Sequence, residues 1–338
     1  MRGWGGIRPC PGWALLGFVT LVLFSSLCCA LGPDFGFPTV ETRRSLGSIN
    51  ENNNAFGMRL LFVGSSVTVP VEWRRVFSRS VKRLKAVIPR GYGENHEREL
   101  CLRKGDVFCG HRFTKRTCIK DVLVLVSIKK RIDGIGGVLA RAAPCGNDVK
   151  GRVRLGYVEV DGADFAGLVR MGKAFDVVTH ELIHALGFGA RWEELGLISR
   201  PSEADPVLMY VGPKGKEALE ALGGQGNVFI ANGESEIAAD RGHFSESTYG
   251  TELMTGHLDL TRRGSAPLSK LTLGALRDLG YSTVDLFIGG EPYTLPEQPF
   301  NETVAFRLFR LATKSKPVEY KDDIARLSVE TIPYDVEK

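Results

Sequence analysis

The sequence predicts an α+β fold, in which a regular first lobe of strands and helices is followed by an irregular second lobe. Three observations predict it. Residues 121–128 form a β-branched apolar run, typical of a strand buried on both faces. Residues 174–187 carry a helical apolar pattern that ends at a glycine. Residues 190–242 are rich in Gly, Pro and Glu and weakly periodic, which indicates a large insertion.

The other elements are predicted from the same signals. A short strand at residues 58–63 is expected to begin the folded structure. Pro70 then opens a helix that continues to Val87, because its apolar residues share one helical face. Residues 153–160 alternate loosely and predict another strand, which we place at an edge of the sheet. A last helix over 271–279 ends at Gly280.

Composition excludes several classes of protein. The chain has 338 residues, of which 43% are hydrophobic and 25% are charged, so it is long enough and apolar enough to bury a sizeable core. These values exclude a largely disordered chain, a collagen-like repeat and a disulfide-dense miniprotein. Lys and Arg number 44 against 39 Asp and Glu, and the resulting charge of only +5 argues against a nucleic-acid partner.

The first 30 residues resemble a secretory signal peptide. Arg2 and Arg8 precede an apolar run over residues 13–31, which ends in small residues at 28–30. We therefore expect a secreted, extracellular protein; the alternative is a membrane anchor, if this apolar segment is retained. Residues 31–57 are interpreted as a linker or short pro-segment, and residues 287–338 as a polar C-terminal tail. Asn301 lies in an N-glycosylation triplet.

Four cysteines remain after the predicted signal peptide: Cys101, Cys109, Cys118 and Cys145. In an oxidising compartment they predict two disulfides, for which the residues alone leave three connectivities open. The alternative is four free, buried thiols.

The pentapeptide from His180 to His184, His-Glu-Leu-Ile-His, carries the strongest chemical signal. On a helix, residues four apart lie on one face, so both imidazoles can direct a nitrogen at one metal ion. Glu181 lies one step round the helix, where it can serve a metal-bound water as general base. The alternative is a pair of core histidines, but two histidines and a glutamate are costly to bury unless a metal satisfies them. We therefore predict one Zn²⁺ per chain.

A catalytic zinc needs a third protein ligand, and four further histidines are candidates: His96, His111, His243 and His257. The ordered features of the chain resemble the leishmanolysin family of metzincin proteases over residues 58–286. These features are the sequence His-Ala-Leu-Gly-Phe at 184–188, an insertion of some fifty residues, His243, and the tripeptide Glu-Leu-Met that ends at Met254. Residues 268–273 and 278–281 also resemble the helix that follows in that family.

The resemblance implies a metzincin-type zincin with a mixed-sheet first lobe that carries the active-site helix. It implies that His243 is the third zinc ligand, since a compact metzincin would have it at Ala190, and that Met254 forms the turn beneath the metal. It also implies a Cys109–Cys145 disulfide, which leaves Cys101 to pair with Cys118. An alternative keeps the protease but uses a glutamate as third ligand, as gluzincins do, with Glu193, Glu194 and Glu246 as candidates.

The function implied is that of a secreted zinc metalloendopeptidase, which hydrolyses peptide bonds of protein or peptide substrates by a zinc-bound water that Glu181 activates. We expect the substrate to lie extended along an edge strand, for which residues 153–160 are the candidate. The alternative function is a catalytically silent binding or adhesion module that keeps the fold.

Overall fold

The computed structural model describes residues 55–64, 68–91, 99–199, 208–231, 242–256, 258–259, 262–286, 289–297 and 330–331. The predicted signal peptide, His96, His257, Asn301 and most of the predicted tail lie outside these residues. Within them, no helix has the length and apolar character needed to cross a membrane.

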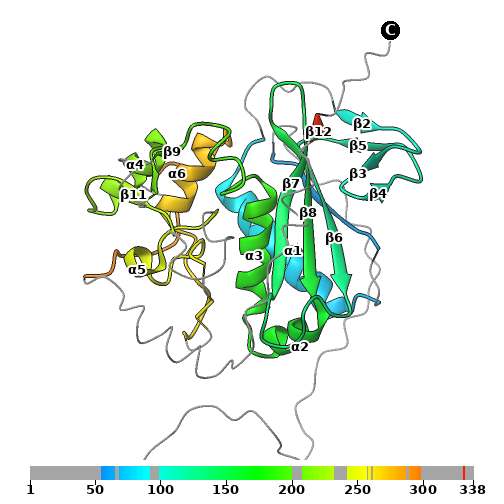
Figure 1. The fold of residues 1–338 in the computed structure, drawn as a ribbon, viewed down its shortest axis with the longest axis horizontal. Helices are drawn as coiled ribbons and strands as arrows, with labels where there is room; N and C mark the ends of the chain where they lie inside the picture. The colour runs from blue at the N-terminus through cyan, green and yellow to red at the C-terminus, as the bar shows by residue number, and fades with distance from the viewer. Residues whose placement is uncertain are drawn as a thin grey trace, which may run out of the picture.

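The first lobe is built on a five-stranded mixed sheet (Figure 1). Its order is β1 (Met58–Phe62), β6 (Val122–Lys129), β8 (Val153–Asp161), β7 (Ala140–Asn147) and β12 (Glu330–Thr331). Strands β1, β6 and β8 are parallel, whereas β7 runs antiparallel to β8 and β12 pairs with the end of β7. The strands predicted at 58–63, 121–128 and 153–160 are thus confirmed, and the fold is α+β with a mixed sheet.

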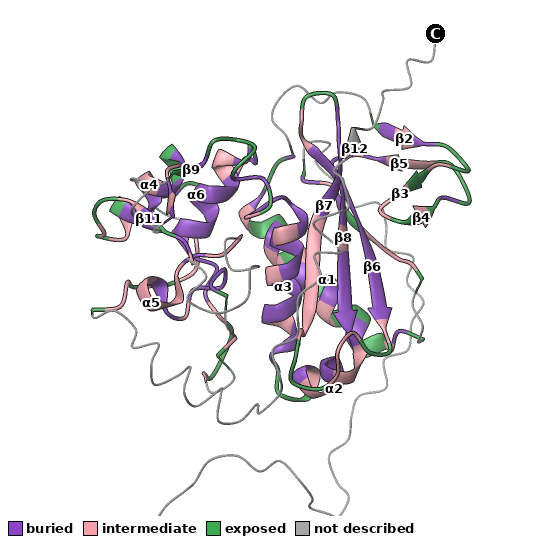
Figure 2. Cartoon of the chain, in the orientation of Figure 1, coloured by how far each residue is buried: buried purple, intermediate pink, exposed green. Residues whose placement is uncertain are grey.

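The placement of residues 153–160 at an edge was wrong. Strand β8 lies between β6 and β7 and is buried along almost all its length, whereas much of β7 is only half-buried (Figure 2). Among the described strands, β7 has an outer neighbour only at Gly146 and Asn147, where β12 pairs with it. The sequence did not predict β7, because its three alanines and Pro144 have low strand propensity, although proline suits an edge strand.

Helices cover one face of this sheet. They are α1 (Val71–Val87), α2 (Gly162–Arg170) and α3 (Ala174–Ala185), and α3 packs against α1, β7 and β8. Pro70 immediately precedes α1, as predicted, and the helix predicted at 174–187 is α3. A glycine on β8 sets how closely α3 approaches: a Cβ at Gly156 would lie 2.7 Å from the carbonyl oxygen of Ala185.

The opposite face is covered by two small ribbons, β2 (Leu100–Leu102) with β5 (Thr117–Ile119) and β3 (Val107–Phe108) with β4 (His111–Arg112). Both predicted disulfides form here, Cys101–Cys118 within one ribbon and Cys109–Cys145 between the ribbons and β7. The second bridge closes the longer loop, since its cysteines are 36 positions apart in the sequence. Two disulfides fit an extracellular protein.

The second lobe lies on the other side of α3 from the sheet (Figure 1). Its described elements are β9 (Ile198–Ser199), β10 (Met209–Tyr210), α4 (Pro213–Ala221), β11 (Val228–Phe229), α5 (Glu246–Tyr249) and α6 (Lys270–Asp278). The helix predicted at 271–279 is α6, and Gly280 follows it with a positive φ of 93°. Residues 190–242, predicted to be irregular, nevertheless contain α4, which packs against α6.

Candidate metal centre

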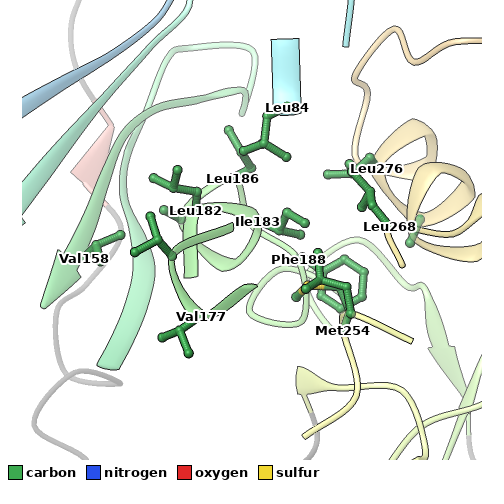
Figure 3. Close-up of a cluster of buried hydrophobic side chains, with 14 of the residues drawn as sticks. Leu84, Val158, Val177, Leu182, Ile183, Leu186, Phe188, Met254, Leu268 and Leu276 are labelled. Atoms are coloured by element: carbon green, nitrogen blue, oxygen red, sulfur yellow. The ribbon is translucent and has the colours of Figure 1, made fainter. Parts of the chain in front are cut away.

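Helix α3 brings the first two histidines together. Its buried side chains, among them Val177, Leu182 and Ile183, lie in the apolar core that α1 and the sheet share (Figure 3). That packing turns His180 and His184 toward the second lobe, where both are half-buried and their Nε2 atoms lie 2.9 Å apart. The spacing of four residues thus places both imidazoles on one helical face, as predicted.

His243, from the second lobe, completes a triangle of nitrogens. Its Nε2 lies 3.1 Å from that of His180 and 3.0 Å from that of His184. In the part of the chain that the structure describes, one other group of three potential ligands lies this close, Glu99 with Cys101 and Cys118, but its cysteines form a disulfide. Glu193, Glu194 and Glu246 do not join the histidines, and Glu194 pairs instead with Arg191.

Hydrogen bonds to carbonyl groups fix which ring nitrogens face the centre. Nδ1 of His180 lies 2.7 Å from the carbonyl oxygen of Leu253, and Nδ1 of His184 lies 3.1 Å from that of Phe188. Because a carbonyl oxygen only accepts, the proton of each ring is on Nδ1. The Nε2 lone pairs therefore point at one another, an arrangement that a cation between them stabilises. This donor set fits a metal ion.

Burial keeps the two helix histidines in the metal-binding form. It lowers the pKa of His180 to about 4, although the hydrogen bond to Leu253 opposes the shift. Burial, together with the neighbouring His180, lowers the pKa of His184 to about 3. Both rings are therefore neutral at pH 7, which is the form that coordinates a metal.

Glu181 lies on the same helix but outside the triangle of nitrogens. Only 8% of its surface is exposed, and burial raises the pKa of its carboxyl group to about 8. A carboxyl group with a pKa near neutrality is well suited to take up and release a proton. The structure thus places one buried carboxyl group on the helix that carries two of the three imidazoles.

Met254 follows Leu253, whose carbonyl group accepts the hydrogen bond from His180. It is fully buried in the apolar cluster that also contains Phe188 and Leu268 (Figure 3). Its carbonyl oxygen accepts a hydrogen bond from the amide N–H of Phe244, the residue after His243. The turn therefore supports His243 through the backbone and His180 through a carbonyl group.

A contact between two glycines brings His243 to α3, and the sequence did not reveal it. A Cβ at Gly189 would lie 2.4 Å from the carbonyl oxygen of Gly242, so the two segments meet backbone to backbone. Gly189 also has a positive φ of 74°. The sequence holds 40 glycines, and nothing in its pattern separates these two from the rest.

Replacing Gly189 by alanine should push residues 242–243 away from α3 and weaken metal binding by roughly tenfold or more, as loss of support around a metal ligand does. Gly196→Ala is the matched control, since Gly196 also has a positive φ of 64° but a Cβ there would meet nothing within 4 Å. The control should lose about 1–2 kcal/mol of stability and keep the wild-type affinity for metal. Competition titrations with a chromogenic chelator measure the metal affinity of the two variants. Equal affinities would show that the glycine contact does not position His243.

Comparison of the sequence with models of known protein families and with curated proteins finds no match.

Proposed function

We propose that this protein is a secreted zinc-dependent metalloendopeptidase of the metzincin type, related to the leishmanolysin family. The observation that carries the proposal is the convergence of His180, His184 and His243 beside Glu181. Three neutral imidazoles leave a divalent cation its full charge and an open position, as in catalytic zinc sites. The two disulfides and the signal-like N-terminal sequence favour secretion.

The chain's own residues support a hydrolytic mechanism. A bound zinc ion would supply Lewis-acid activation of water and of the scissile carbonyl group. Glu181 would take the proton of the attacking water and transfer it to the nitrogen of the leaving amine. His180 and His184 would hold the ion through Nε2, with their Nδ1–H groups held by Leu253 and Phe188.

The free edge of β7 is the best candidate for binding an extended substrate. Residues 140–144 of β7 pair with β8 on one side and, among the described residues, with no strand on the other. An extended peptide can add to such an edge through backbone hydrogen bonds. Strand β7 also packs against α3, which carries the two helix histidines.

The proposal is tested on the full chain, produced in a secretory host so that the disulfides form. We expect one zinc per chain by plasma mass spectrometry, and hydrolysis of denatured casein that a chelator abolishes and added Zn²⁺ restores. Folded protein without stoichiometric metal, or peptidase activity that survives chelation, would contradict the proposal. Metal without any peptidase activity would favour the silent binding module instead.

A further inference from the structure

Glu252 is a buried carboxylate that links two parts of the second lobe. Only 2% of its surface is exposed. One carboxylate oxygen, Oε1, accepts hydrogen bonds at the start of α6, from Ser269 N–H at 3.2 Å, Ser269 Oγ at 2.7 Å and Thr272 Oγ1 at 2.6 Å. The other, Oε2, accepts from the amide N–H of Met254. The two oxygens thus bond different neighbours, the start of α6 and the turn at Leu253–Met254.

The hydrogen bond to Met254 acts on the same peptide group that holds His180. The N–H of Met254 and the C=O of Leu253 belong to one planar unit, and a trans peptide directs them in opposite directions. Glu252 accepts from the N–H end, while His180 Nδ1 donates to the C=O end at 2.7 Å. The chain of contacts therefore runs from carboxylate to peptide group to imidazole, and each hydrogen bond polarises the next.

We propose that Glu252 is a positioning residue for the metal centre, which orients His180 through the Leu253–Met254 peptide group. The inference rests on the metal site of the proposed function. A histidine ligand is commonly oriented by a carboxylate or a carbonyl group on its second nitrogen, and here the two act in series. The same carboxylate also stabilises the N-terminus of α6, where negative charge is favourable.

The two roles of Glu252 can be separated because they use different oxygens. In Glu252→Gln the side chain keeps its volume but has only one oxygen. Three donors converge on the α6 side, against one at Met254, so the amide oxygen should stay with α6 and the amide NH₂ should face the Met254 N–H. Thr272→Val is the complementary control, since it removes an α6 hydrogen bond and leaves the Met254 contact intact.

The experiment measures binding of Zn²⁺ and Co²⁺ to the full chain, with Co²⁺ absorption bands as a probe of ligand geometry. Glu252→Gln should bind zinc roughly tenfold or more weakly and show shifted Co²⁺ bands while remaining folded by circular dichroism. Thr272→Val should melt at a lower temperature but keep the wild-type affinity and spectrum. Wild-type affinity and spectrum in Glu252→Gln, or an equal loss of affinity in Thr272→Val, would overturn the inference.

Should Glu252→Gln fail to fold, Glu252→Asp provides the same test, because its carboxylate is one methylene too short to reach both neighbours. The same weakening is expected, and its absence would overturn the inference. Wild-type protein that binds metal but hydrolyses no peptide would contradict the proposed function while leaving the metal-binding comparison decisive. Wild-type protein that binds neither ion would contradict both.

Discussion

Replacing Glu181 by alanine should lower the rate of peptide hydrolysis by roughly 10²–10⁴-fold and leave the metal content unchanged, because general acid–base catalysis typically contributes that factor. Glu181 lies on α3 between the two helix histidines, yet it is outside the group of potential metal ligands. Its carboxylate is thus available to the attacking water rather than to the ion. Measurements of kcat/KM beside metal analysis of the same preparation would separate these roles.

The matched control for this variant is Glu193→Ala. Glu193 lies after the same helix but is exposed, and no potential metal-ligand group of the described chain includes it. It should retain both metal and activity. Loss of stoichiometric zinc from folded Glu181→Ala would contradict the assigned role, and loss from Glu193→Ala would favour a glutamate as third ligand.

Replacing His243 by alanine should remove one corner of the nitrogen triangle and abolish activity. Structural zinc sites bind with apparent free energies of about 10–16 kcal/mol over four ligands, so the loss of one ligand should weaken binding by roughly 100-fold or more. The two remaining histidines, His180 and His184, would still face each other across 2.9 Å. Isothermal titration with Zn²⁺ would measure the loss.

His111→Ala is the control for His243→Ala. His111 lies on β4, its ring 5.1 Å from that of Phe113, and it belongs to none of the ligand groups in the described chain. Its replacement should leave zinc affinity and activity nearly unchanged. Zinc affinity that survives in His243→Ala would refute the assignment of the third ligand.

Short-range patterns in the sequence determined several of the helices and strands and two of the three histidines of the site. The helices at 71–87, 174–185 and 270–278 and the buried strand at 122–129 follow from apolar spacing and from the residues at their ends, such as Pro70 and Gly280. The pairing of His180 with His184 needs nothing beyond the pitch of a helix. The disulfide Cys109–Cys145 was implied by resemblance to a family and not by the residues alone, since four cysteines allow three pairings.

The tertiary structure alone decided which segments meet. The sequence placed β8 at an edge and missed β7, because strand order depends on packing partners and not on alternation within one strand. The sequence could not predict that the carbonyl groups of Leu253 and Phe188 bond the two helix histidines, since every residue has a carbonyl group. His243, 59 residues beyond His184, reaches the centre because the backbones of Gly189 and Gly242 pack in contact. Local spacing specifies a helix and two ligands; a close approach between distant segments depends on the packing of the whole core.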